Sequence, residues 1–185
     1  MFNEKKAAQM AAFLLQKGGG ELNVLKLTKL LYLAERESMD RVGMSISDDY
    51  MVSMPNGPVL SNTLDLTNGN VRSAQWESWI EDREHHNVKL KKNFVREDLS
   101  SLSQNAISAL EAVWDKFGKM DQWELVKYTH DKCDEWENPG KSSFPIPSKR
   151  VLKALGKSHD EIEVLSRELA AQKCFDRLFD EEGAC

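Results

Sequence analysis

The chain has 185 residues, of which 41% are hydrophobic and 30% are charged, a balance typical of a folded domain with a well-solvated surface. Its net charge of −5 does not favour bulk attraction to nucleic acid, and no run of about 18 apolar residues is present to span a membrane. The three cysteines are widely spaced and form no CxxC pair, so they predict neither a disulfide framework nor a zinc site.

The first 20 residues combine lysines with apolar residues, as a signal peptide does. Their apolar stretch is interrupted at Gln9 and ends at Gln16, and no clean cleavage pattern is present. We therefore expect an amphipathic helix over Asn3–Lys17, ended by three glycines, in a cytoplasmic protein.

A second helix is expected to follow the N-cap Asn23 and to end at Gly43. Two of its faces carry apolar residues: Val24, Leu27, Leu31, Ala34 and Ser38 on one, and Leu25, Tyr32 and Met39, beside Lys29 and Arg36, on the other. A helix that is apolar on two sides is usually central to its domain. Core packing explains both faces, and the alternative is that the Tyr32 face is partly exposed and contacts a partner.

The segment "SMPNGPVLSNTLDL" contains a rigid corner over residues 55–58. Pro55 and Pro58 each fix φ near −65°, and Asn56-Gly57 suits left-handed turn angles. The pattern predicts a strand over Asp49–Met54, a stiff turn, and then a helix that ends at Gly69.

The later segments predict more helices and one short strand. Helical segments are expected around Trp76 and Trp79, from the cap Ser103 to Gly118, over Asp121–Lys132, over residues 148–156 and from Ser158 onward. The stretch "NVKLKKNF" alternates, so we expect a strand that pairs with Asp49–Met54. The predicted fold is mainly α: a compact multi-helix domain over residues 1–156 with a small two-stranded β element, and a C-terminal acidic helix over residues 157–185.

The C-terminal charges are unevenly distributed. From Ser158 to Cys185 there are eight acidic and three basic residues, whereas Lys141–Lys157 has five basic residues and no acidic one. Either these two segments face each other or solvent, or the acidic helix docks on a basic partner. The apolar residues of this helix do not form one stripe, so we expect it to bend, to wrap or to meet a second chain.

No catalytic motif is evident. His85-His86 are adjacent and point about 100° apart on a helix, so an exposed helix end is favoured over a metal site. His130 and Cys133 lie one turn apart and suggest a nucleophile, but a buried, hydrogen-bonded histidine is favoured because Trp123 and Val126 share its face. We expect no enzyme activity, no cofactor and no metal.

Two blocks of the sequence carry a family resemblance. The first is "LKLTKLLYLAERESMDRVGMSISDDYMVSMPNGPVLSNTLDL", which contains a KLxKLLYxA helix and a GPV corner at residues 57–59. The second is "ALEAVWDKFGKMDQWELVKYTHDKCDEW", with its WEL and TH elements. Both blocks resemble the Panacea domain, the family of SocA-like antitoxins that also includes phage-associated GepA-like proteins. Many members have an aromatic residue where this chain has Asn56, and the helix beyond Ser158 lies outside the resemblance.

The resemblance implies a mainly helical fold and an antitoxin that binds a protein toxin encoded by an adjacent gene. Two alternatives are an adaptor that delivers the toxin to an ATP-dependent protease and a DNA-binding autorepressor, against which the acidic net charge counts. The last helix either contacts the toxin or another copy of the chain. A rigid corner loses little entropy on docking, so we expect the toxin-binding residues to be Lys29, Tyr32, Arg36, Met54, Asn56, Gly57, Pro58 and Val59. The alternative is that Gly57-Pro58 only steers the chain into the core.

Overall fold

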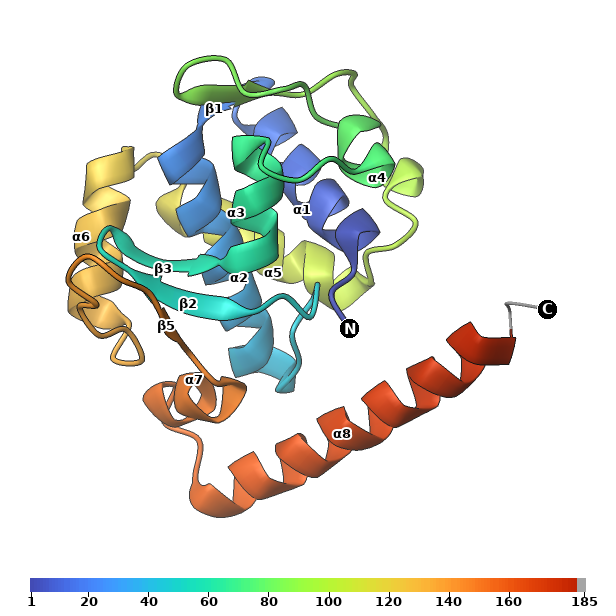
Figure 1. Cartoon of the computed structure of the whole chain (residues 1–185), viewed down its shortest axis with the longest axis vertical. Helices are drawn as coiled ribbons and strands as arrows, with labels where there is room; N and C mark the ends of the chain where they lie inside the picture. Colours follow the sequence, from blue (N-terminus) through green and yellow to red (C-terminus); the bar gives the residue numbers. More distant parts are fainter. Residues whose placement is uncertain (183–185) are drawn as a thin grey trace.

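Helix α2 (Val24–Val42) runs through the centre of the molecule and contacts α1, α5, α6 and β3 in the computed structural model (Figure 1). The structure describes the backbone of residues 1–182, and the side chains of residues 1–168 and 170–171. The Asn23 side chain caps α2 by accepting hydrogen bonds from the N–H groups of Leu25 and Lys26, and Gly43 ends it with φ of 72°. The expected helix and both of its ends are confirmed.

The remaining helices surround α2. The described residues form α1 (Glu4–Lys17), α3 (Ser61–Asn68), α4 (Ala74–Glu77), α5 (Gln104–Phe117), α6 (Gln122–Lys132), α7 (Ser148–Ala154) and α8 (His159–Glu182), with a 3₁₀ turn over Arg96–Asp98. The mainly α fold is confirmed. The helix expected around Trp76 is only four residues long, and the chain then leaves the helix to form a β-bridge between Ile80 and Leu90.

Two small antiparallel sheets complete the fold. One pairs β1 (Glu21–Asn23) with β4 (Asn87–Lys89), and the other has the order β3 (Gly57–Leu60), β2 (Met51–Met54), β5 (Phe144–Pro145). The expected pairing of the two predicted strands is therefore wrong. Chain reversal at the proline corner brings β3 onto one edge of β2, β5 takes the other edge, and β4 pairs with β1 instead.

The corner itself is a β-hairpin. The sequence predicts a turn over residues 55–58 and a helix from Val59, but residues 57–60 pair with β2 in a register that sets Met54 opposite Gly57 and Ser53 opposite Pro58. The strand forms because Gly57 has φ of 96°, which turns the chain back onto β2, and Pro58 faces a position where no N–H donor is required. Helix α3 starts only at Ser61.

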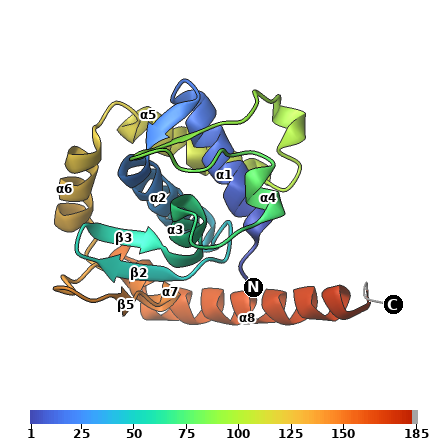
Figure 2. The same cartoon turned by 45° about the horizontal axis from the view of Figure 1, so that its top comes forward.

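Helix α8 packs on α7 at its start and then continues past it (Figure 2). Ile162 is buried, and Lys149 forms a 2.8 Å ion pair with Glu163, so the basic and acidic segments meet at this point. The backbone is one continuous helix, and the expectation for the apolar side chains beyond residue 171 lies outside the described side chains. No helix among the described residues has the length and apolar character needed to cross a membrane.

Candidate functional site

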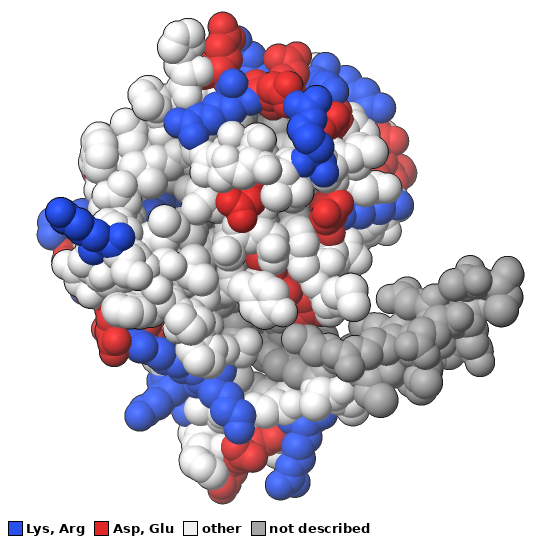
Figure 3. Space-filling view, viewed as in Figure 1, with Lys and Arg blue, Asp and Glu red and all other residues white. Residues whose placement is uncertain are grey.

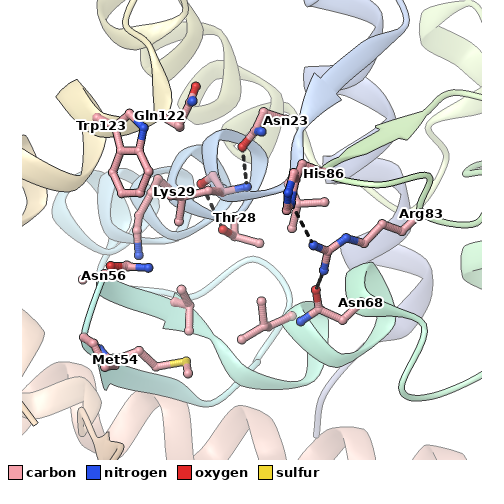
Figure 4. A pocket seen from close by; sticks show the side chains of 16 residues that line it. Asn23, Thr28, Lys29, Met54, Asn56, Asn68, Arg83, His86, Gln122 and Trp123 are labelled. Atoms are coloured by element: carbon pink, nitrogen blue, oxygen red, sulfur yellow. Dashed lines mark hydrogen bonds between the residues drawn. The ribbon is translucent and has the colours of Figure 1, made fainter. Parts of the chain in front are cut away.

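A pocket of about 600 Å³ lies between the N-terminal ends of α2 and α6, the turn of the β2–β3 hairpin, α3, and the loop before β4 (Figure 4). Its lining residues are Asn23, Val24, Leu25, Thr28, Lys29, Met54, Pro55, Asn56, Gly57, Val59, Leu64, Asn68, Arg83, His86, Gln122 and Trp123. None of these residues is acidic. This volume is in the range of pockets that hold a small ligand or a few side chains of a partner.

Gly57 is required at the hairpin turn for two separate reasons. Its φ of 96° is rarely adopted by residues with a side chain, and a Cβ there would lie 2.6 Å from the Thr129 Oγ1 and 3.2 Å from the Lys29 Nζ. The indole N–H of Trp136 also donates a 3.0 Å hydrogen bond to the Met54 carbonyl. The turn is therefore held rigidly against α2 and α6.

Lys29 is a buried cation at the floor of this pocket. Its side chain is 0% exposed, and its Nζ donates a 2.8 Å hydrogen bond to the Pro58 carbonyl. No carboxylate of the described chain lies within ion-pair distance of it. Burial lowers the pKa of Lys29 to about 7, opposed by the nearby Cys133 thiol, so the amine is close to half-protonated at neutral pH.

Arg83 supplies the second charge of the pocket. Among the described residues its guanidinium bonds no carboxylate, and its partners are the Asn68 side chain, the His85 carbonyl 2.7 Å from Nε, and the His86 ring 3.4 Å from Nη2. Figure 4 shows Arg83 and Lys29 at opposite ends of the pocket. The lining between them is mainly apolar, so the site combines an apolar wall with a cation at each end.

Tyr32 and Arg36 do not reach this pocket. The Tyr32 side chain is 0% exposed, and its hydroxyl donates a 2.6 Å hydrogen bond to the Glu135 carboxylate, to which the Arg36 Nε also donates at 2.7 Å. Core packing of Tyr32 is therefore confirmed, and the alternative of a partly exposed Tyr32 is wrong, because this group of three side chains anchors the segment after α6 to α2. Burial raises the pKa of Tyr32, with the charge of Glu135 adding to the effect.

His130 and Cys133 lie behind the hairpin rather than in an open site. The His130 ring stacks on Trp136 with centroids 3.9 Å apart, and its buried Nε2 has no hydrogen-bond partner within the described chain, so the expected hydrogen bond is wrong at this nitrogen. Burial, together with the charge of Lys29, lowers the pKa of His130, and burial raises the pKa of Cys133 to about 12. Cys133 is therefore a protonated thiol at neutral pH and a poor nucleophile.

The two adjacent histidines are separated by the turn. His86 lines the pocket, whereas His85 adopts a left-handed φ of 55°, and both are exposed. They are not at the end of a helix, which corrects that expectation. Over the part of the chain that the structure describes, no group of three or more metal-ligating side chains comes together.

Five of the eight residues expected to bind a partner meet at the pocket: Lys29, Met54, Asn56, Gly57 and Val59. The neighbouring Pro58 accepts the Lys29 hydrogen bond through its backbone carbonyl.

Sequence reasoning missed Trp123, Arg83 and His86. Trp123 was assigned to the inner face of its helix, but it is 59% exposed at the pocket rim. Its position in the first turn of α6, next to the capping Asp121, was the available signal.

Comparison with known proteins gave one match. A family model described as "Antitoxin SocA-like, Panacea domain" matches residues 27–137, which contain most of α2, the hairpin, Arg83, His86 and Trp123. No curated protein and no solved structure matched the chain. Because the match covers more than half of the chain, the protein belongs to the SocA-like antitoxin family and carries its Panacea domain.

Proposed function

We propose that this protein is the antitoxin of a toxin–antitoxin pair and neutralises a cognate protein toxin by binding it directly. Membership of the SocA-like antitoxin family supports an antitoxin role in general. Direct binding is our inference from the site. The proposal assigns no reaction to the chain, since binding alone blocks the toxin.

The observation that carries this proposal is the exposed aromatic ring at the rim of a rigid pocket. Trp123 is 59% exposed, and it lines the same pocket as the exposed Pro55 and Asn56 of the hairpin turn. Exposed tryptophan beside a preformed pocket is a common centre of binding energy in protein interfaces. The hairpin is held by Gly57 and by the Trp136 hydrogen bond, so docking costs little conformational entropy.

The wider surface fits a protein partner. Figure 3 shows a broad uncharged area on the face that carries β3 and α3, with charged side chains of both signs gathered along its upper edge. An uncharged centre with a charged rim is typical of protein interfaces. A continuous basic surface, which a DNA-binding autorepressor requires, is not favoured by a net charge of −5.

The test is co-expression with the product of the neighbouring gene. The neighbour is placed under an inducible promoter, and growth is measured with and without this protein. We expect the neighbour alone to stop growth, this protein to restore it, and the two purified chains to form a complex. A neighbour that is not toxic, or a toxic one that forms no complex with this protein and is not neutralised, would contradict the proposal.

The same assay separates the adaptor and repressor alternatives. Repeating it in strains that lack each ATP-dependent protease should leave neutralisation intact, because direct binding needs no protease. Loss of neutralisation in one such strain would identify an adaptor instead. A salt-dependent shift of the promoter DNA by this protein would reveal a repressor.

A further inference from the structure

The two cations of the pocket defined above, Lys29 and Arg83, bond no carboxylate within the described chain. Lys29 donates to the Pro58 carbonyl, and Arg83 bonds an amide oxygen, a carbonyl and an imidazole. A buried charge without an opposite charge is costly to the fold. A protein that retains Lys29 at this cost therefore offers an unpaired positive group to whatever enters the pocket.

The hydrogen-bonding capacity of Lys29 points the same way. A protonated amine has three donors, and one hydrogen bond to a protein acceptor is present. Replacing Lys29 with an apolar residue of similar length would fill the same space without a charge. The charge itself is therefore the feature that the site adds to an otherwise apolar wall, formed by Leu25, Val59 and Leu64 among others.

The donors around the pocket favour a carboxylate over a phosphate. A phosphate has three acceptor oxygens and is usually held by several free N–H groups at a helix start. Here the first amides of α2 bond to Asn23, and those of α6 bond to Asp121. The same engagement of amides disfavours a chain-terminal carboxylate, which is usually captured by backbone N–H groups. A carboxylate side chain needs only the amine.

Access to Lys29 passes two exposed residues. Figure 4 shows the Lys29 amine between the Trp123 ring and the Asn56 side chain. Asn56 is exposed on the hairpin turn, and Trp123 is 59% exposed. Because Lys29 itself is 0% exposed, an entering group must displace one of these side chains, and both are on the surface, where such movement is least restricted.

We propose that this pocket receives an aspartate or glutamate side chain of the toxin, whose carboxylate pairs with Lys29 while a neighbouring apolar residue of the toxin lies against Leu64 and Trp123. Arg83, at the other end of the pocket, attracts the acidic segment. The inference rests on the proposed function, because it names the chemistry by which the toxin is recognised. The lowered pKa of Lys29 supports it, since an incoming carboxylate would restore the proton that burial disfavours.

The pocket is tested without the toxin by a matched pair of small probes. The full chain is titrated with 4-phenylbutanoate and with its uncharged amide, 4-phenylbutanamide, and the indole N–H resonance of Trp123 is followed by NMR. We expect the carboxylate to bind about tenfold more tightly than the amide, in line with one charge-assisted hydrogen bond. Equal binding of the two probes, or no binding of either, would overturn the inference.

Two lysine variants locate the effect. Lys29→Met should remove the preference for the carboxylate, whereas Lys26→Met should keep it. Lys26 is the matched control because it lies on the same helix, donates a 2.7 Å hydrogen bond to the Gly118 carbonyl, and does not line the pocket. Preference retained in a folded Lys29→Met variant would overturn the inference. If that variant does not fold, the probe comparison on the natural chain decides alone.

A second experiment, with variants of the toxin, identifies the residue that supplies the carboxylate. Each surface aspartate and glutamate of the neutralised toxin is changed to its amide, and binding is measured to the natural chain and to Lys29→Met. We expect one change to weaken binding to the natural chain about tenfold and to have no effect on the variant. If only a blocked toxin C-terminus gave this pattern, the side-chain assignment would be wrong.

The two proposals fail in different ways. A chain that neutralises its toxin but binds both probes equally retains the proposed function and loses this inference. A chain that prefers the carboxylate probe while neutralising no neighbouring protein retains an anion pocket and loses both the function and the toxin as occupant.

Discussion

The buried amine of Lys29 donates a 2.8 Å hydrogen bond to the carbonyl oxygen of Pro58, which ties the second turn of α2 to the start of β3. The two residues are 29 positions apart, and both belong to the segment that matches the family model. The hydrogen bond satisfies a buried carbonyl while it leaves the lysine charge without a counterion. If Lys29 binds the toxin as proposed, stability and binding are linked at this one contact.

The first prediction concerns pH. The pKa of Lys29 is about 7 in the folded protein and 10.5 in the unfolded chain, so between these values the unfolded state holds the extra proton. The free energy of unfolding should therefore rise with pH, by about 1.5 kcal/mol between pH 7 and 8.5. Above pH 9 the buried Cys133, whose pKa is raised to about 12, acts in the opposite direction, so that range is avoided.

Urea unfolding at several pH values checks this prediction. The comparison is the natural chain against Lys29→Met, which should lack the rise, and against Lys26→Met, which should keep it. A natural chain whose free energy of unfolding is flat from pH 7 to 8.5 would show that the pKa of Lys29 is not lowered. The slope is informative even if Lys29→Met is less stable overall through loss of the Pro58 hydrogen bond.

The second prediction concerns the hairpin turn. Gly57→Ala should destabilise the protein more than Gly69→Ala, although both residues have left-handed φ values of 96° and 73°. Gly69 has nothing within 4 Å of an added Cβ, so its replacement costs only backbone strain of about 1 kcal/mol. At Gly57 the clash with Thr129 adds about 2 kcal/mol. Equal losses in urea unfolding would mean that the turn relaxes away from α6.

The third prediction concerns the exposed tryptophan. Trp123→Ala should weaken toxin binding about 30-fold, the effect expected of an interface hot spot. It should change the free energy of unfolding by less than about 0.5 kcal/mol, because the ring is mostly exposed. Phe144→Ala is the control, since Phe144 is 47% exposed on β5 and does not line the pocket. Calorimetric titration of toxin into each variant measures these affinities. Equal toxin affinities of the natural chain and Trp123→Ala would show that Trp123 does not contribute to the interface.

The fourth prediction separates stability from binding at Tyr32. Tyr32→Phe removes the hydrogen bond to Glu135 but keeps the Arg36 ion pair, so it should cost about 1 kcal/mol of stability. Because Tyr32 is buried and does not line the pocket, neutralisation of the toxin should be unchanged at a temperature where the variant is folded. Lost neutralisation in a folded variant would instead support the sequence-based assignment of Tyr32 to the binding surface.

Much of the helical fold could be predicted because its signals are local. Asn23 and Gly43 bound α2 through their own side-chain and backbone chemistry, and Ser103 likewise caps α5. The hairpin could not be predicted in the same way. Whether residues 57–60 continue as a helix or as a strand depends on β2, on Thr129 and on Lys29, which lie elsewhere in the chain.

The residues of the candidate site likewise fall into a group that local sequence could predict and a group that it could not. Met54, Asn56, Gly57 and Val59 are close in sequence, so the family motif was enough to group them with Lys29. Arg83, His86 and Trp123 come from a loop and a later helix, and no local pattern connects them to the motif. Tyr32 was wrongly grouped with the binding residues. Its hydroxyl bonds to Glu135, which is far away in the sequence, so the sequence alone could not show that Tyr32 is internal.

By itself the sequence determined a mainly helical chain and the bounds of its major helices, because capping and apolar periodicity act over a few residues. It also carried the family motif. Only the tertiary structure decided that the proline corner is a hairpin, that Tyr32 is internal, and that Lys29 and Arg83 are the opposed cations of one pocket. These features are set by contacts between residues that are far apart in the sequence, and such contacts exist only once the helices and strands have packed together.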